Sequence, residues 1–82
     1  MTARVTLYTR VGCHLCEEAR VVVQAVCDDL GEAFEEVDVD SAVELQEAYS
    51  DQVPVTLVDG RRHDFWRVDE RRLRTALARP AG

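Results

Sequence analysis

The sequence predicts an α/β protein in which a four-stranded mixed sheet is flanked by helices on both faces, in the order βαβαββα. Short runs of alternating apolar and polar residues, typical of strands, are separated by stretches with helical periodicity. Strands joined through a helix are expected to run parallel, whereas the tight turn signal Asp59-Gly60 makes the last two antiparallel. Because neither a linker nor an internal repeat interrupts this pattern, we expect residues 1–82 to form a single domain.

The first half of the chain is predicted to form a strand, a helix and a second strand. Residues 4–9 alternate and are rich in β-branched and aromatic side chains, which favours a strand. Residues 13–30 carry apolar side chains at helical spacing, and Gly31 provides a C-terminal stop. Residues 34–39 alternate again and predict the second strand. The helix's inward stripe comprises Cys16, Ala19, Val23, Val26, Cys27 and Leu30.

A short second helix is expected next. Ser41 and Glu44 have the S-x-x-E spacing of a capping box, which satisfies two amides at a helix start. Residues 50–53 break the helix, and residues 55–58 are apolar enough for a strand buried on both faces. The apolar residues of this helix are Leu45, Ala48 and Tyr49.

The end of the chain is predicted to form a hairpin strand and a helix. Asp69 is a candidate cap for the last helix, and Pro80 lies beyond its end. Trp66 is expected to be a core or half-buried sheet residue, with a substrate platform as the alternative. The fourth strand is expected to pass through Phe65, Trp66 and Val68, and the last helix to bury Leu73, Ala76 and Leu77.

Charge is unevenly distributed along the chain. The net charge of -6 argues against nucleic-acid binding, which requires phosphates to be neutralised by Lys and Arg. Up to Val58 there are three Arg against twelve acids, a net charge of -9, whereas from Asp59 onward seven Arg against four acids give +3. The Arg-rich end is most simply a solvated surface, and a carboxylate-binding patch is the alternative.

Other features limit the class of protein. No apolar run approaches the ~18 residues of a membrane span, and an alternating pattern at the N-terminus leaves no room for a signal peptide, so a cytoplasmic monomer is expected. Three cysteines are too few for a secreted disulfide scaffold, and two of them are spaced C-x-x-C. This spacing indicates catalysis or metal binding.

The strongest functional signal is Gly12-Cys13-His14-Leu15-Cys16, at the point where the first strand leads into the first helix. Free amides and the helix dipole at a helix start can lower a thiol pKa from ~8.5 by about one unit. Cys13 is therefore the predicted nucleophile, and Cys16, on the core-facing stripe, the resolving thiol. Protonated His14 and Arg10 would add positive charge beside the thiolate, against the acids of the first turn, and both are candidate substrate-binding residues.

The sequence also allows two other roles for the cysteines. The pair would be half of a zinc site if His14 or His63 were a third ligand, but structural zinc needs four ligands and no second pair is present. We therefore expect no metal. Cys27 lies about 21 Å along the helix from Cys13, out of disulfide range, and is expected to be a buried small hydrophobe.

The run Leu7–Cys16, followed by Val53-Pro54-Val55, resembles the glutaredoxin-type branch of the thioredoxin superfamily, and the resemblance covers about residues 5–77. In that family the proline is cis and faces the cysteine pair, and the residue before it offers backbone hydrogen bonds to the substrate. The resemblance implies the thioredoxin-like (glutaredoxin-type) fold and substrate-binding roles for Val53 and Pro54.

The chain departs from the family pattern in places. His14-Leu15 replaces the common Pro-Tyr between the cysteines, a pair that is expected to set redox poise. Trp66-Arg67-Val68-Asp69 stands where glutaredoxins carry a Gly-Gly-x-Asp turn for the glutamyl end of glutathione, so only Asp69 remains as a binding residue. Leu7 occupies about the place of the buried acid of thioredoxins, which favours the glutaredoxin-like interpretation.

The sequence thus predicts a thiol-disulfide oxidoreductase that exchanges two electrons through its dithiol without a cofactor. Its expected substrate is a disulfide-containing protein or a low-molecular-weight disulfide, without nucleic-acid or membrane partners. The reductant is left open between a reductase, glutathione and another small thiol. The alternative from a different class is a non-catalytic binding module or a metal-dependent interaction module.

Overall fold

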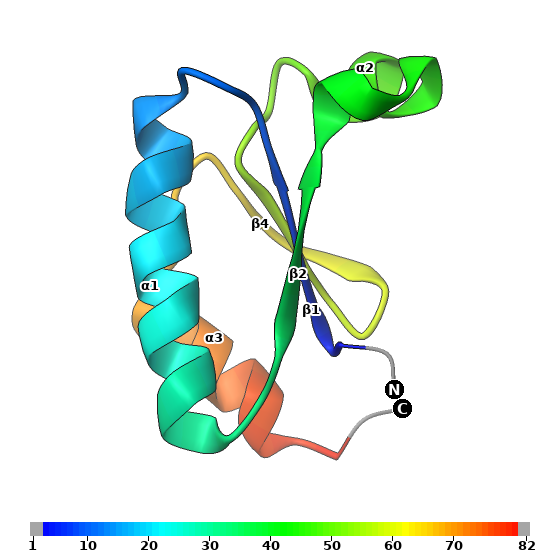
Figure 1. The fold of residues 1–82 in the computed structure, drawn as a ribbon. Helices are drawn as coiled ribbons and strands as arrows, with labels where there is room; N and C mark the ends of the chain where they lie inside the picture. The colour runs from blue at the N-terminus through cyan, green and yellow to red at the C-terminus, as the bar shows by residue number, and fades with distance from the viewer. Residues whose placement is uncertain (1–2, 81–82) are drawn as a thin grey trace.

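The computed structural model describes residues 3–80, and it confirms the predicted βαβαββα order with one short 3-10 helix added (Figure 1). The expectation of a single domain over residues 1–82 stays a prediction, and residues 1–2 and 81–82 lie outside the described range. The elements are β1 (Val5–Thr9), α1 (His14–Leu30), β2 (Phe34–Asp38), η1 (Val39–Ser41), α2 (Val43–Tyr49), β3 (Val55–Val58), β4 (Arg61–Phe65) and α3 (Glu70–Ala78).

The four strands form one mixed sheet in the order β2-β1-β3-β4. β1 and β2, joined through α1, are parallel as predicted, and the β3–β4 hairpin is antiparallel. The prediction of parallel strands around the second helix is wrong, because β3 runs antiparallel to β1, which itself is parallel to β2. α2 has seven residues, or about 10 Å of helix, too short to return the chain to the start of a strand. The chain therefore re-enters the sheet at the end where it left.

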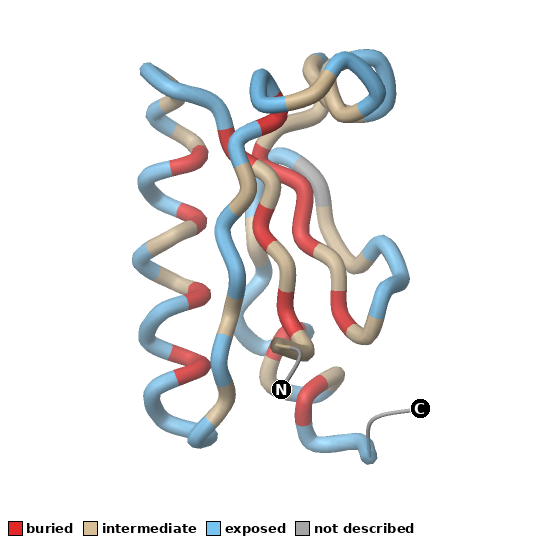
Figure 2. The backbone as a smooth tube through the Cα atoms, turned by 45° about the vertical axis from the view of Figure 1, so that its right-hand side comes forward, coloured by how far each residue is buried: buried red, intermediate tan, exposed pale blue. Residues whose placement is uncertain are grey.

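Helices lie on both sides of the sheet, but unequally. α1 and α3 lie together on one face, and α2 lies on the other side, at the end of the sheet where β1 and β2 finish (Figure 1). The buried residues of α1 follow one another along the side that faces the sheet (Figure 2). The core between them and the strands comprises Val5, Leu7, Ala19, Val23, Val26, Cys27, Val58, Leu73 and Leu77.

Some expected core positions are not buried. Leu30, the last residue of α1, is 43% exposed because the helix ends there, and Gly31 follows in the left-handed conformation predicted for its stop. In α2 Leu45 and Tyr49 are half-buried and Ala48 is exposed, so this helix adds nothing to the core. Instead, the Tyr49 ring stacks on that of Tyr8, with 4.6 Å between centroids, on the far face of the sheet.

The predicted capping box at Ser41 is wrong. The chain first makes the 3-10 helix η1, in which the Asp38 carboxylate accepts the N–H of Asp40 at 2.8 Å. The Ser41 hydroxyl donates to the Asp38 carbonyl oxygen at 2.6 Å, so it is not directed at the start of α2. α2 begins instead after Ala42, without a side-chain cap.

The hairpin and the last helix follow the prediction more closely. Asp59 and Gly60 both have positive φ, 53° and 80°, as a two-residue hairpin loop requires. β4 ends at Phe65 rather than continuing to Val68, because Trp66 takes a left-handed φ of 65° that a strand cannot hold. Asp69 caps α3 as predicted. Among residues 3–80, no helix is long and apolar enough to cross a membrane.

Candidate active site

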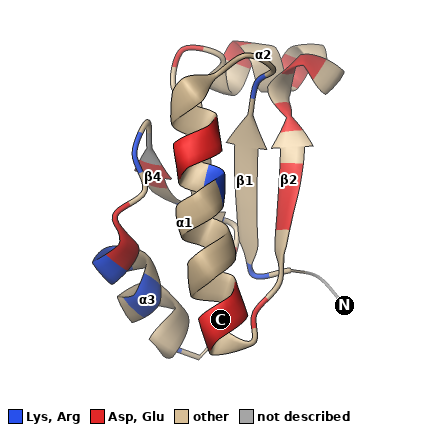
Figure 3. Ribbon diagram, turned by 60° about the vertical axis from the view of Figure 1, so that its left-hand side comes forward, with Lys and Arg blue, Asp and Glu red and all other residues tan. Residues whose placement is uncertain are grey.

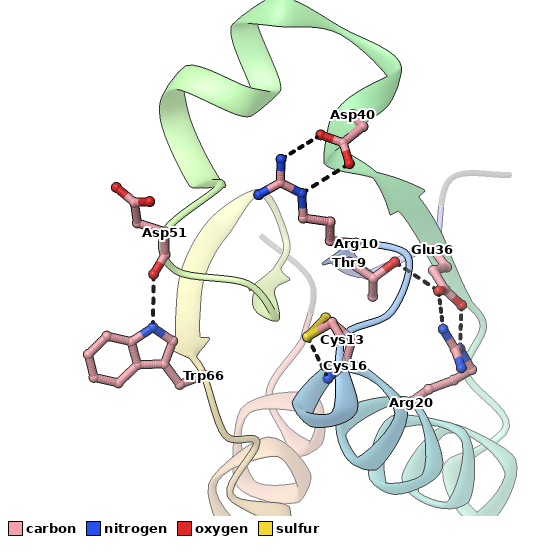
Figure 4. The surroundings of a disulfide bond; sticks show 9 residues. All are labelled: Thr9, Arg10, Cys13, Cys16, Arg20, Glu36, Asp40, Asp51 and Trp66. Atoms are coloured by element: carbon pink, nitrogen blue, oxygen red, sulfur yellow. Dashed lines mark hydrogen bonds and ion pairs between the residues drawn. A yellow bond between two sulfur atoms is a disulfide. The ribbon is translucent and has the colours of Figure 1, made fainter.

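Cys13 is the residue that caps α1. Its backbone is extended, and its Sγ accepts a hydrogen bond from the backbone N–H of Cys16 at 3.1 Å. The two cysteines are joined by a disulfide, with 5.2 Å between their Cα atoms (Figure 4). Gly12, just before them, has φ 79°, so the turn into the helix uses a conformation that favours glycine.

The two sulfur atoms lie in different surroundings. Cys16 is 1% exposed and faces the core, whereas Cys13 is half-buried at the surface. An amide that donates to the Cys13 sulfur at a helix start favours its ionised form once the disulfide is reduced. A thiolate that can be reached from outside and a second sulfur behind it are the arrangement that disulfide exchange requires.

Arg10 and His14 do not gather around the sulfurs. The guanidinium of Arg10 donates to both carboxylate oxygens of Asp40, at 3.0 and 3.1 Å, and Figure 4 shows it directed away from the disulfide. This ion pair raises the pKa of Arg10 and lowers that of Asp40. His14 is exposed at the first position of α1. Their roles in substrate binding stay predictions.

A second polar network, which the sequence did not reveal, fastens α1 to β2 beside the site. The buried hydroxyl of Thr9 donates to Glu36 at 2.9 Å, and Arg20 donates to both oxygens of the same carboxylate at 2.7 and 2.6 Å (Figure 4). Hydrogen bonds from Arg20 and then Thr9 lower the pKa of Glu36 against the opposing effect of its burial. The N-terminal turns of α1 are thereby held against the sheet.

The loop before β3 has the form that the resemblance implies. The Val53-Pro54 peptide bond is cis, and Pro54 is buried. The backbone N–H of Trp66 donates to the carbonyl oxygens of Pro54 at 2.7 Å and Gln52 at 3.3 Å. The indole Nε1–H of Trp66 donates to the Asp51 carbonyl oxygen at 3.2 Å (Figure 4). Trp66 therefore ties the end of β4 to the proline loop.

An open groove runs beside the cysteine pair. Its first part, about 380 Å³, is lined by Leu15, Val53, Trp66 and Arg67. A second hollow of about 220 Å³ continues along α1 and shares Leu15, Trp66 and Arg67. Leu15 stands between the two cysteines in the sequence, so one wall of the groove belongs to the first turn of α1, where the disulfide lies.

The expectation of a core or half-buried Trp66 is wrong, because its side chain is a wall of this groove and the residue is 52% exposed. Its left-handed backbone turns the side chain out of the sheet. This is the position at which the glutaredoxin pattern has a Gly-Gly-x-Asp turn. The replacement of that Gly-Gly by Trp66-Arg67 was the sequence signal that could have identified both residues as groove walls. Leu15 carried no such signal.

Asp69 follows the groove residues Trp66 and Arg67 closely in the sequence, but it lines neither part of the groove. Its carboxylate accepts the N–H of Arg72 at 3.0 Å, and its own N–H donates to Asp64. It is thus engaged in capping α3. Within the described residues, no three His, Cys, Asp or Glu side chains are grouped as a metal site would require.

Comparisons with known proteins agree with this geometry. The family model described as Glutaredoxin-like domain (DUF836) matches residues 4–78. The uncharacterized protein Rv0508 of Mycobacterium tuberculosis is 38% identical over 81 residues, which cover 93% of this chain and 84% of the relative. The solved structure of protein XcR50 from X. campestris is 37% identical, with a TM-score of 0.75, and covers 93% of this chain and 99% of that one.

A glutaredoxin from Archaeoglobus fulgidus shows the same fold at 17% identity, with a TM-score of 0.63 over 93% of this chain and 87% of that one. The predicted α/β thioredoxin-like fold is confirmed. The family model spans nearly the whole of the described chain and includes the cysteine pair, the cis-proline loop and the groove. The chain belongs to the glutaredoxin-like domain family (DUF836) of the thioredoxin superfamily.

Proposed function

We propose that the protein is a thiol-disulfide oxidoreductase. The Cys13 thiolate attacks one sulfur of a substrate disulfide, forms a mixed disulfide and releases the other substrate sulfur as a thiolate. The Cys16 thiolate then attacks the Cys13 sulfur, releases the second substrate sulfur and closes the Cys13–Cys16 disulfide. Two electrons pass to the substrate, its thiolates take up two protons, and an external thiol reductant restores the dithiol.

One observation carries this proposal. The sulfur of Cys13 accepts the Cys16 N–H at the start of α1, while the sulfur of Cys16 lies buried behind it. The more exposed member of the pair is therefore the one whose negative charge the backbone favours. Such an asymmetry distinguishes an attacking thiol from a resolving one.

The groove beside the pair supports a substrate that extends beyond its disulfide. Leu15, Val53 and the Trp66 ring offer apolar contact, and Arg67 forms no ion pair with the described residues. A chain that carries an apolar side chain next to its cysteine, with a carboxylate nearby, matches these walls. We propose a protein disulfide or a low-molecular-weight disulfide as the substrate and a monomer in the cytoplasm, without nucleic-acid partners, as the working form.

A redox titration tests the proposal. The protein is equilibrated in thiol-disulfide buffers of defined potential, and its free thiols are counted by alkylation and mass spectrometry. We expect one two-electron transition confined to Cys13 and Cys16, between roughly -120 and -270 mV. The proposal fails if no transition occurs, or if copurified zinc protects both thiols throughout, which would favour the metal-dependent interaction module.

Two cysteine variants assign the roles. In a disulfide-reduction assay, Cys13→Ser should abolish turnover, because the buried Cys16 thiol cannot start the exchange. Cys16→Ser should instead accumulate a mixed disulfide at Cys13, visible as a mass increase that a reductant removes. Full activity of Cys13→Ser would contradict the assignment.

A further inference from the structure

A second groove, unrelated to the cysteine pair, lies between β4 and α3. Its larger hollow, about 400 Å³, is lined by His63, Arg71, Arg72, Thr75, Ala76 and Arg79. An adjoining hollow of about 260 Å³ shares His63, Ala76 and Arg79 and adds Arg61 and Arg62. We call these two hollows the β4–α3 groove. They share no lining residue with the groove beside the cysteines.

The β4–α3 groove carries positive charge that the described part of the chain leaves unneutralised. The guanidiniums of Arg61, Arg71 and Arg79 form neither an ion pair nor a hydrogen bond with any residue from 3 to 80. Asp59, which itself lines the smaller hollow, pairs with Arg4 at 2.9 Å, and Asp64 pairs with Arg72 at 2.7 Å, so both carboxylates are already engaged. Three cations thus remain available on a chain whose net charge is -6.

Positive charge gathers around α3 and β4, whereas most of the acids lie elsewhere. Figure 3 shows blue on α3 and mostly red on α1, β2 and α2, with further red where β4 leads into α3. Arg20 and Arg10 are paired with acids outside the groove, Glu36 and Asp40. A ligand attracted to the β4–α3 groove must therefore be acidic and short enough to avoid the acidic side.

The length of the groove suits an extended peptide. Arg71 and Thr75 lie four residues apart on one face of α3, which rises about 10 Å from Arg71 to Ala78, and Arg79 follows as the next residue with an extended backbone. Roughly three residues of extended chain span the same length. Guanidiniums at both ends and on the opposite wall, at Arg61, can each bind a carboxylate of such a chain.

We propose that the β4–α3 groove binds an acidic peptide segment of a partner protein. Carboxylates at alternate positions of the segment meet the free guanidiniums, and the partly buried His63 and Ala76 form the floor between them. The site does not depend on disulfide exchange, because none of its residues touches the cysteine groove. It gives the chain a second point of attachment at which a partner can be recognised.

An NMR titration tests this proposal on the full chain labelled with 15N. The probe is a hexaglutamate peptide with blocked termini, and hexaglutamine is its neutral counterpart. We expect hexaglutamate to shift the amide signals of residues 61–63 and 71–79 while those of Cys13 and Cys16 stay in place. Hexaglutamine should shift none of them at the same concentration.

A matched pair of double variants separates the groove from general electrostatics. Arg71→Gln with Arg79→Gln should weaken hexaglutamate binding at least tenfold. Arg20→Gln with Arg74→Gln removes the same charge from guanidiniums that are already paired with acids, and should change the affinity less than twofold. Retained amide dispersion shows that each variant is folded.

Four results would overturn the proposal. The two double variants could lose affinity equally, which would mean that net charge alone governs binding. The shifts could fall outside the groove, or be absent at millimolar peptide. Finally, a six-nucleotide oligothymidylate could bind the groove as tightly as hexaglutamate, which would identify a nucleic-acid site instead of a protein one.

Discussion

The backbone N–H of Trp66 donates to the carbonyl oxygen of Pro54 at 2.7 Å, so the residue that ends β4 also holds the cis-proline loop. The same residue turns its indole into the groove beside the cysteines. One amino acid therefore connects the backbone of the proposed substrate loop with the side-chain wall opposite Leu15. The roles of its backbone N–H and of its ring can be tested separately, because every residue except proline keeps the N–H, whereas substitution removes the ring.

Trp66→Gly removes the ring but keeps the backbone hydrogen bonds. Glycine adopts the observed φ of 65° freely, a relief of roughly 1–2 kcal/mol that offsets the lost indole hydrogen bond of about 1 kcal/mol. Stability should thus change little, while the KM for a protein disulfide rises about tenfold, since an apolar wall is lost. Trp66→Phe keeps an aromatic wall and should leave KM within about twofold. Equal KM values in the two variants would argue against the ring as a substrate contact.

Replacement of Thr by Val should have opposite effects on stability at positions 56 and 9. Thr56 is fully buried and its hydroxyl has no hydrogen-bond partner among residues 3–80. Thr56→Val should therefore raise the free energy of unfolding by about 1 kcal/mol. Thr9→Val removes a hydrogen bond to the Glu36 carboxylate and should lower it by about 1–2 kcal/mol. Urea unfolding measures both, and a Thr56→Val protein less stable than wild type would contradict the assignment of its hydroxyl.

Arg4 connects the two halves of the chain. Its guanidinium donates to both oxygens of Asp59 and to Glu32, and also to the carbonyl oxygens of Leu77 and Arg79. Arg4→Met should lower stability clearly more than Arg20→Met, which removes an exposed pair with a single carboxylate. Thermal unfolding of the two variants makes the comparison.

The ion pair between Arg4 and Asp59 makes the stability of the protein depend on pH. The Arg4 guanidinium lowers the pKa of Asp59 in the folded protein. The resulting stability is present above the ordinary carboxyl range near pH 4 and is lost as the pH falls below it, because the unfolded chain binds the proton first. Urea unfolding between pH 7 and pH 2.5 should show a shallower acid-side loss in Arg4→Met than in wild type. An unchanged slope would mean that Arg4 does not lower the pKa of Asp59 in the folded protein.

The burial of His63 predicts a loss of stability at lower pH. Burial, with a further contribution from Arg72, lowers its pKa against the opposing charges of Asp64 and Asp69. The neutral form is favoured in the folded state, so stability is complete above the unfolded pKa near 6.5 and falls as the pH drops below it. His63→Gln should flatten stability between pH 7 and pH 5. A His63→Gln protein whose stability still falls as steeply as that of the wild type between pH 7 and pH 5 would contradict this role of His63.

The sequence identified what depends on periodicity and on local turn chemistry. The stripe on α1, the Asp59-Gly60 hairpin and the capping role of Asp69 each follow from a spacing of a few residues, and each is present. The predictions for the direction of β3 and the start of α2 were wrong because both depend on how far a short helix carries the chain. A spacing such as that of Ser41 and Glu44 cannot show that a 3-10 turn has already used the hydroxyl.

The candidate site, too, could be predicted only in part from the sequence. Cys13 could be placed at the start of a helix from the sequence alone, because the strand-to-helix transition fixes that position. The groove could not, since its walls meet only through the left-handed turn at Trp66, which joins residues distant in sequence. The ion pair that occupies Arg10 is also a tertiary contact, formed with a residue thirty positions away.

The burial of Cys27 makes the wild-type chain suitable for single-site labelling. Its thiol is 1% exposed, and burial raises its pKa, so it stays protonated and shielded at neutral pH. Cys16 is equally hidden. A maleimide dye or spin label added to the reduced native protein therefore attaches to Cys13, two residues from the groove wall Leu15. No cysteine has to be removed to place one reporter where a bound molecule would alter its signal.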